Sequence, residues 1–166
     1  MIRRAELRDL PELMEIYNEA ILNTTATFDT EVKDYEDREK WFHAHTGKYC
    51  IFVYEKDKRA AGYASLSQYR DRKAFDSAVE ISIYIHKDYR GQHIGHALMK
   101  ETLDFAKANP EIVTVISLIT SENAASIHLH EKYGFAYCGQ IKNAGIKFQK
   151  TLSLNAYQII YERDFQ

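Results

Sequence analysis

Tyr89-Arg90-Gly91-Gln92-His93-Ile94-Gly95-His96 is a basic, glycine-bearing loop between two regular patterns. Residues 79–85 alternate like a half-buried strand, and residues 91–108 have the apolar spacing of a helix. A helix N-terminus carries roughly half a positive charge and free backbone N–H groups, which suit a phosphate. The loop therefore predicts a site for a phosphate-bearing ligand, although a further glycine would suit the position of His93 better.

The bulk composition restricts the class of protein. The chain has 166 residues, of which 45% are hydrophobic, and this predicts one domain over residues 1–166. The formal net charge of −2 argues against a broad face for nucleic acid or membrane, because such a face would be basic. Every uncharged apolar run is far shorter than the roughly 20 residues of a membrane span.

The first residues and the cysteines bear on the compartment. Ile2-Arg3-Arg4-Ala5-Glu6 lacks the apolar stretch of a signal peptide. Cys50 and Cys138 are the two cysteines, and neither belongs to a Cys-x-x-Cys pair. We therefore expect two reduced thiols in a cytoplasmic protein.

Apolar periodicity and turn signals predict seven strands and four helices. We expect strands at 2–5, 49–55, 61–67, 79–85, 113–119, 135–140 and 153–162, and helices after Asp9, at 34–46, at 91–108 and at 123–133. Residues 142–151 are an unassigned connection. The order βααβββαβαββ contains a βαβ crossover between 79 and 119. It predicts the α/β class, with a mixed, mostly antiparallel central sheet flanked by helices.

Two segments together resemble a known enzyme family. Arg90-Gly91-Gln92-His93-Ile94-Gly95 resembles the Q/R-x-x-G-x-G/A signature of the GNAT N-acetyltransferases. Asn123-Ala124-Ala125-Ser126, followed by residues 129–135, resembles the second cofactor segment of that family. The resemblance implies the GNAT fold, in which the βαβ core binds acetyl-CoA.

Further segments are similar to one branch of that family, the phosphinothricin and methionine-sulfoximine acetyltransferases. They are residues 16–21 with 25–30, residues 79–85, and Gly145-Ile146-Lys147-Phe148, so the resemblance covers nearly the whole chain. His93 replaces the usual first glycine of the loop. After Phe148 the branch usually has Gly, Arg, Trp and, two residues on, Asp, whereas this chain has Gln149, Lys150, Thr151 and Ser153.

The resemblance implies a set of residues for acetyl-CoA. The loop is expected to bind pyrophosphate through backbone N–H groups, which a residue other than glycine permits if its φ is negative. Strand residues are expected to pair with the pantetheine amides, and two helix residues to contact the cofactor. The set is Gly91, Gln92, His93, Ile94, Gly95 and His96 in the loop, Ile83, Tyr84 and Ile85 in the strand, and Asn123 and Lys132 in the helix. Each has a structural alternative: the loop is a plain helix start, the strand is a core strand, Asn123 is only an N-cap, and Lys132 is a solvated lysine.

Glu80 and His130 are the candidate catalytic residues. Glu80 shares a pleat with Ser82 and Tyr84, opposite the isoleucines of its strand. A carboxyl group there could have a raised pKa and accept an amine proton through a water, and the resemblance implies this role; an exposed strand glutamate is the alternative. His130 stands where many relatives have a tyrosine that protonates the thiolate. It could act as the acid or contact the sulfur, with Tyr84 and Tyr133 as other donors, or be a surface histidine.

The acceptor site is expected from a basic loop before Glu80. Arginine binds a carboxylate through two hydrogen bonds, so a basic loop suits an amino-acid acceptor. The resemblance implies an acceptor near this loop, with an aromatic wall from the threonine-rich segment; a solvated loop is the alternative. The residues are Arg70, Arg72, Lys73, Ala74 and Phe75, with Phe28 as the wall.

Two other kinds of site are excluded. The seven histidines form no His-Glu-x-x-His motif or Cys/His quartet, so no metal site is expected. No Gly-Lys-Ser/Thr follows the glycines, which excludes a P-loop. We therefore expect an acetyl-CoA-dependent N-acetyltransferase that acts on a small amino acid or analogue in a ternary complex, as a homodimer like the enzymes it resembles. Acetylation of a protein N-terminus or polyamine, and a non-catalytic CoA sensor, remain as alternatives.

Overall fold

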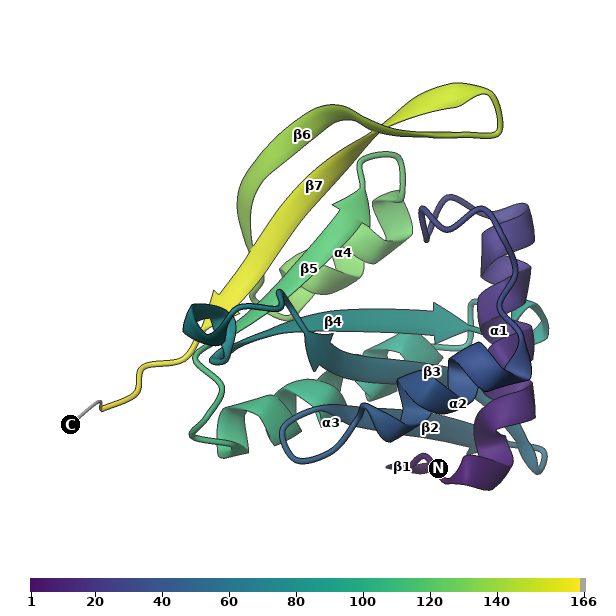
Figure 1. Ribbon diagram of the computed structural model, residues 1–166, viewed down its shortest axis with the longest axis horizontal. Helices are drawn as coiled ribbons and strands as arrows, with labels where there is room; N and C mark the ends of the chain where they lie inside the picture. Colours follow the sequence, from purple (N-terminus) through teal and green to yellow (C-terminus); the bar gives the residue numbers. More distant parts are fainter. Residues whose placement is uncertain (165–166) are drawn as a thin grey trace.

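The central sheet contains seven strands in the spatial order β1-β2-β3-β4-β5-β7-β6 (Figure 1). The computed structural model describes residues 1–164. Strands β4 and β5 are parallel, and the other neighbouring strands pair antiparallel. The strands are β1 (Ile2–Arg4), β2 (Cys50–Lys56), β3 (Arg59–Gln68), β4 (Ala78–Ile85), β5 (Thr114–Thr120), β6 (Ala136–Lys147) and β7 (Lys150–Ile160). The predicted fold class and order of elements are confirmed.

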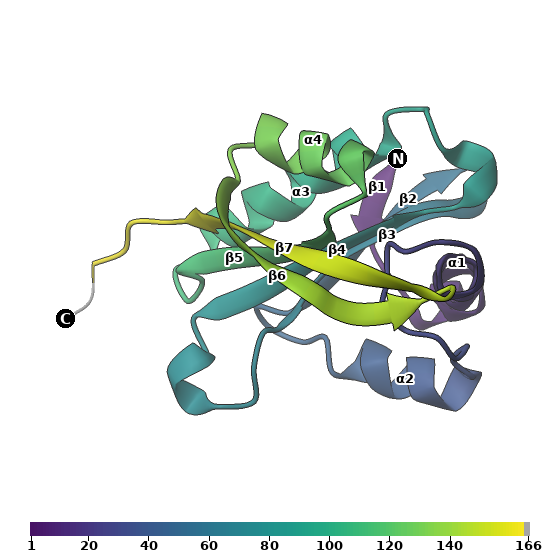
Figure 2. The same cartoon turned by 90° about the horizontal axis from the view of Figure 1, so that it is seen from above.

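Helices cover both faces of this sheet. The helices are α1 (Leu10–Asn23), α2 (Tyr35–His43), α3 (Ile94–Ala108) and α4 (Ala124–Lys132). Figure 2 shows α1 and α2 on one face and α3 and α4 on the other. The larger core lies under α3 and includes Val79 and Ile81 of β4, whereas a second cluster under α1 includes Leu13, Ile16 and Tyr63. Among residues 1–164, none of the helices combines the length and apolarity needed to cross a bilayer.

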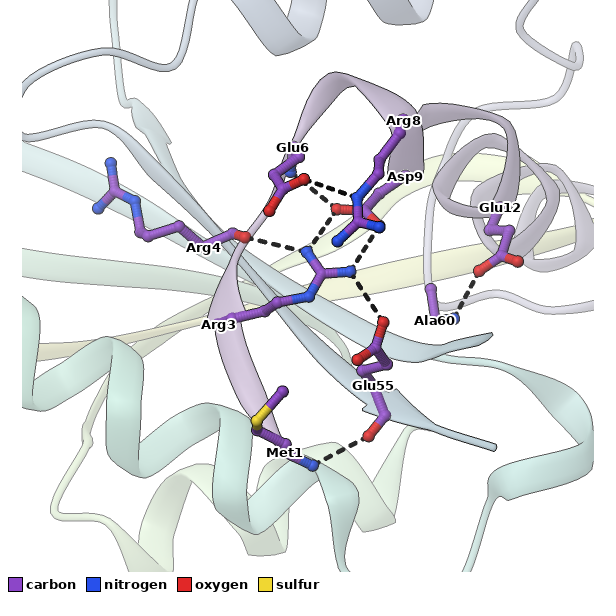
Figure 3. Close-up of polar contacts among 9 residues, drawn as sticks. All are labelled: Met1, Arg3, Arg4, Glu6, Arg8, Asp9, Glu12, Glu55 and Ala60. Atoms are coloured by element: carbon purple, nitrogen blue, oxygen red, sulfur yellow. Dashed lines mark hydrogen bonds and ion pairs between the residues drawn. The ribbon is translucent and has the colours of Figure 1, made fainter. Parts of the chain in front are cut away.

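Ion pairs fix the start of α1 against the first two strands. The helix follows Asp9, as expected, and Asp9 occupies its N-cap position. The Asp9 carboxylate accepts hydrogen bonds from Arg3 at 2.8 Å and from the backbone N–H of Glu6 at 2.7 Å. Arg3 also donates to Glu55 of β2 at 3.2 Å (Figure 3). Burial raises the pKa of the Asp9 carboxyl, but the Arg3 and Glu6 hydrogen bonds outweigh it, so this pKa lies below its ordinary value.

The β6–β7 hairpin occupies the segment that the sequence left unassigned. Lys147 of β6 pairs with Lys150 of β7, so Phe148 and Gln149 alone form the turn. Their φ angles are 52° and 62°, the left-handed pair that a two-residue hairpin turn requires. Such turns usually contain Asn-Gly or Asp-Gly, and this chain lacks that signal. For this reason the sequence did not reveal the hairpin.

The crossover β4-α3-β5 produces the feature that positions the site. The parallel ladder joins Ala78 to Thr114, Val79 to Val115 and Glu80 to Ile116, and it extends no further. Beyond Glu80, β4 continues to Ile85 while β5 pairs with β7. The backbone edge of β4 that faces β5 therefore has no strand partner over its second half.

Candidate active site

A cavity of about 600 Å³ lies where β4 and β5 diverge. Its walls come from β4, the start of α3, the start of α4 and the loop after α1. The sequence-predicted residues on its walls are Ile83, Tyr84, Ile85, Gly95 and Asn123. Its remaining walls include Thr24, Thr25 and Ala26 of the loop, Arg90, Glu122, Leu129 and Phe148. An unpaired strand edge beside a cavity of this size is suited to an extended, amide-containing ligand.

The loop before α3 differs from the expected geometry. Helix α3 begins at Ile94, three residues later than predicted, because Gly91 has a φ of 76° and His93 a φ of 61°. The condition of a negative φ for a residue other than glycine is therefore not met at His93. His93 occupies a left-handed position that favours glycine, which explains why glycine is usual there in the enzymes that this chain resembles.

The remaining loop residues surround the helix start. Gly95 allows α3 to pack closely on α4, because a Cβ atom there would lie 3.3 Å from Leu129 Cδ2. Gln92 is exposed and accepts a hydrogen bond from Lys56, whereas Ile94 is buried. The His96 ring is 5.6 Å from that of His93, and its pKa is lowered by burial and by the charge of Lys132. Lys132 therefore lies close enough to this loop to add positive charge to it.

Glu80 lies at the point where the two strands separate. Ile83 and Ile85 pack with the core under α3, so Glu80, Ser82 and Tyr84 face α1 and α2, as the alternation predicts. Burial raises the pKa of the Glu80 carboxyl, and the charge of Arg70 partly opposes this shift. The carboxyl group is therefore half-buried beside the strand edge, with a cation within electrostatic reach.

The expected acceptor residues fall into two separate places. The Arg70 guanidinium donates a hydrogen bond to the backbone carbonyl of Tyr69 and lies 4.3 Å from the centroid of the Tyr69 ring. Arg72, Lys73, Ala74 and Phe75 are exposed, and Lys73–Phe75 forms a short 3-10 helix. Phe28 instead contacts Gly145 of β6, where a Cβ atom would lie 2.8 Å from its ring.

Phe28 and the basic loop therefore do not form one wall. Residues 69–77 lead into the start of β4, and the loop after α1 lies near the other end of that strand (Figures 1 and 2). The strand has eight residues, which span roughly 25 Å. The combination of Phe28 with the basic loop in a single acceptor wall is not found in this chain.

His130 is buried, so the alternative of a surface histidine is wrong. Its Nδ1 atom lies 2.7 Å from the carbonyl oxygen of Ser126, and its Nε2 atom lies 2.8 Å from the Ser117 hydroxyl. Burial lowers the pKa of this imidazole. A smaller cavity of about 50 Å³ joins His130 and Ser117 to Ile83 and Tyr84 of β4.

The two tyrosines that were considered as proton donors differ. The Tyr133 hydroxyl donates to the carbonyl of His96 at 3.1 Å, so its proton is already engaged in a hydrogen bond within the protein. Tyr84 lines both cavities and lies beside Tyr17, with 5.2 Å between ring centroids. Burial raises the pKa of Tyr84 well above its ordinary value, so this phenol stays protonated.

Residues 10–135 match the family described as the acetyltransferase (GNAT) family. The chain belongs to the GNAT acetyltransferases. It is 36% identical over 159 residues to an L-amino acid N-acyltransferase of Escherichia coli K12, covering 95% of this chain and 92% of the relative. It is 35% identical over 160 residues to an L-methionine sulfoximine/L-methionine sulfone acetyltransferase of Pseudomonas aeruginosa, again covering 95% and 92%.

A solved GNAT structure also superposes closely. It is a phosphinothricin acetyltransferase from Sinorhizobium meliloti in complex with acetyl-CoA. The TM-score is 0.90 at 31% identity, and the match covers 96% of this chain and 87% of that one. The predicted family and fold are therefore confirmed. The predicted co-substrate is acetyl-CoA, with which this relative was solved.

Several residues of this GNAT site were not predicted from the sequence. Glu122 joins the loop after α1 to the hairpin, because its carboxylate accepts from Thr25 at 2.7 Å and from Lys150 at 2.8 Å. Lys147 is buried and donates to the Thr27 carbonyl at 2.9 Å. These contacts link segments that are far apart in the chain, so no local sequence pattern predicts them.

Ser117 was also missed, but the sequence does carry a signal for it. It is a polar residue in the middle of the apolar run of β5, and it is buried. A buried hydroxyl needs a hydrogen-bond partner, which here is His130. Within residues 1–164, no cluster of three or more His, Cys, Asp or Glu side chains is arranged to hold a metal ion.

Proposed function

We propose that this chain is an acetyl-CoA-dependent N-acetyltransferase whose acceptor is the amine of a small amino acid or close analogue, such as methionine sulfoximine or phosphinothricin. The observation that carries this proposal is the position of Glu80. Its half-buried carboxyl lies where β4 leaves β5, beside a strand edge without a partner. Acetyl transfer requires a base next to a held thioester, and in this proposal the Glu80 carboxyl is the base and the free strand edge holds the thioester.

Glu80 acts as the general base in this proposal. Burial raises the pKa of its carboxyl, which brings the group closer to the working pH and improves it as a proton acceptor. The carboxylate takes a proton from the ammonium group of the acceptor through a water, and the neutral amine then attacks the thioester carbonyl directly. Backbone N–H groups of the free β4 edge, at Ile83 to Ile85, hold the pantetheine arm and face the carbonyl oxygen.

Tyr84 is the donor that faces the departing thiolate in this proposal. Its phenol is protonated, and the residue lines both cavities. His130 has a different task, because its two ring nitrogens are engaged by Ser126 and Ser117. It supports the wall of the smaller cavity and fixes the direction of the Ser117 hydroxyl.

Arg70 is the proposed partner of the acceptor carboxylate. It lies within electrostatic reach of Glu80 and is exposed, so its guanidinium remains available for a bidentate contact. Gly91, Gln92, His93, Ile94, Gly95 and His96, with Asn123 and Lys132, are the proposed contacts for the phosphate-bearing part of acetyl-CoA.

We further propose a homodimer that forms through β6 and functions in the cytoplasm. Strand β6 lies at one edge of the sheet, and it exposes Tyr137, Ile141 and Ile146. An uncovered edge with large apolar side chains is prone to pairing with another chain, so a second copy is a suitable cover. Sedimentation of wild-type protein and of Ile141→Lys tests this: the variant should sediment as a monomer, and a monomeric wild type refutes the dimer.

Release of free thiol from acetyl-CoA, measured over a panel of acceptors, tests the function. Methionine sulfoximine, phosphinothricin and the natural L-amino acids should support turnover, whereas polyamines and N-terminal peptides should be poor acceptors. Turnover only with peptides or polyamines would support those alternative acceptors instead. Binding of acetyl-CoA without turnover on any amine would indicate a sensor module.

A further inference from the structure

His45 contacts the sheet on the same face as Glu80. It follows α2, and its ring packs on Trp41 with 4.9 Å between centroids. Its Nδ1 atom lies 2.6 Å from the Trp41 carbonyl oxygen, and its Nε2 atom lies 2.8 Å from the hydroxyl oxygen of Ser67 on β3. The sequence patterns assigned neither residue a role.

The directions of these two hydrogen bonds follow from their chemistry. A carbonyl oxygen only accepts, so Nδ1 of His45 carries the hydrogen and donates it to Trp41. Burial lowers the pKa of this imidazole, the Trp41 carbonyl raises it, and the charge of Arg38 lowers it, with a net decrease. The ring is therefore neutral near pH 7, and Nε2 has a free lone pair. Ser67 must then donate its hydroxyl hydrogen to His45.

Ser67 stands directly opposite Glu80 in the β3–β4 ladder. Side chains of such cross-strand partners share one face, with Cβ atoms about 5 Å apart. Because its hydrogen is directed to His45, the Ser67 oxygen presents only lone pairs to its other neighbours. A fixed hydrogen-bond acceptor therefore stands beside the carboxylate of Glu80.

We propose that Ser67, oriented by His45, is a positioning residue that accepts a hydrogen bond from the acceptor amine while Glu80 removes a proton from it. This inference rests on the proposed function. A primary amine retains two N–H bonds after losing one proton from its ammonium form, so one can reach Ser67 while the other stays near Glu80. A secondary amine retains a single N–H bond. The pair Ser67 and His45 therefore favours primary over secondary amines.

The arrangement also has a defined pH dependence. When His45 is protonated, both ring nitrogens donate, and the Ser67 hydroxyl must turn its hydrogen away from His45 and toward Glu80. The charge of Arg38 on α2 acts on the pKa of His45, and the charge of Arg70, in the loop after β3, acts on the pKa of Glu80 on β4. In this orientation one lone pair of the Ser67 oxygen accepts from His45, and the Ser67 hydrogen occupies the Glu80 carboxylate that has to accept the proton of the amine. The rate therefore falls as the pH decreases through the pKa of His45.

Four variants test the assignment. Ser67→Ala removes the acceptor, and Ser67→Thr restores a hydroxyl at the same position. His45→Gln keeps an acceptor for Ser67 without a titrating ring, whereas His45→Phe keeps the aromatic packing and removes the acceptor. Ser67→Ala should lower kcat/KM for a primary amine up to about tenfold, the upper end of the effect of one hydrogen bond between neutral groups, and leave KM for acetyl-CoA unchanged.

The controls separate positioning from mere folding. Ser67→Ala should lower kcat/KM for an N-methyl amino acid much less than kcat/KM for the parent amino acid. His45→Gln should remain active, and the acidic side of its pH–rate profile should lack one ionisation. Equal losses for both amines, or an unchanged rate in Ser67→Ala, would overturn the inference while leaving the proposed function intact. A wild-type enzyme without turnover on any amine would instead refute the proposed function, and this inference with it.

Discussion

Nε2 of His130 and the hydroxyl oxygen of Ser117 lie 2.8 Å apart inside the sheet–helix core. The other ring nitrogen of His130 faces the Ser126 carbonyl at 2.7 Å, which can only accept a hydrogen bond. The neutral ring therefore carries its hydrogen on Nδ1 and accepts from Ser117. It has no proton on Nε2 to give to a thiolate.

Replacing His130 should accordingly affect the rate less than replacing Tyr84. His130→Gln preserves an acceptor for Ser117, so we expect it to retain most of kcat. Tyr84→Phe removes the donor that we assign to the thiolate and should lower kcat by about 10²-fold or more. Steady-state kinetics at saturating acetyl-CoA measure both. A loss in His130→Gln that exceeds the loss in Tyr84→Phe would return the acid role to His130.

The two buried histidines also predict how stability changes with pH. Burial lowers the pKa of both His45 and His130 in the folded protein, whereas both titrate near 6.5 when the chain is unfolded. Protons therefore bind the unfolded state more readily, and the free energy of unfolding should fall as the pH decreases below about 6.5. Urea titrations between pH 5 and 8, in the approximate range of histidine titration, measure this. The double variant His45→Gln/His130→Gln should show a flatter profile.

His93 is held in a left-handed conformation, with a φ of 61°. His93→Gly should relieve strain of about 1–2 kcal/mol but also increase the entropy of the unfolded chain by a comparable amount, so stability should change little. KM for acetyl-CoA should be unchanged or lower, because the loop binds phosphate through backbone groups. His96→Gly is the matched control, since it places glycine inside α3 and should destabilise the protein. A large rise in KM for His93→Gly would show that the imidazole itself contacts the co-substrate.

Arg70 and Arg72 belong to one exposed loop and form a matched pair. The charge of Arg70 lowers the pKa of the Glu80 carboxyl, so Arg70 lies within electrostatic reach of the proposed acceptor site. Arg70→Ala should therefore raise KM for the amino acid at least tenfold, with little change in KM for acetyl-CoA. Arg72→Ala should have a smaller effect on both constants. Equal effects of Arg70→Ala on both KM values would refute the acceptor role.

Local patterns were sufficient to predict most of the fold. The alternation of 79–85 and the helical spacing after it gave the order of elements and placed Glu80 on the face away from the isoleucines. The β6–β7 hairpin was missed because Phe148 and Gln149 form a left-handed turn without glycine or asparagine. The start of α3 was placed too early because a sequence pattern does not report the φ of His93.

The site itself was predicted less completely, because its polar partners come from distant segments. Glu80 and Asn123 could be found from their own neighbourhoods, as a carboxyl in an apolar strand and as a helix cap. The contacts of Ser67 with His45 and of Ser117 with His130 depend on strand register and helix packing. Phe28 was grouped with the basic loop on resemblance alone, and the length of β4 separates them.

The central claim is that Glu80 removes a proton from the acceptor amine, and Glu80→Gln tests it most directly. The measurement is the pH dependence of kcat with acetyl-CoA and an amino-acid acceptor, together with KM for acetyl-CoA. The wild-type rate should rise with pH through the raised pKa of Glu80. In the variant, kcat should be about 10²–10⁴-fold lower and should no longer rise with pH, whereas KM for acetyl-CoA should be nearly unchanged. A variant with the wild-type rate and pH profile would contradict the account.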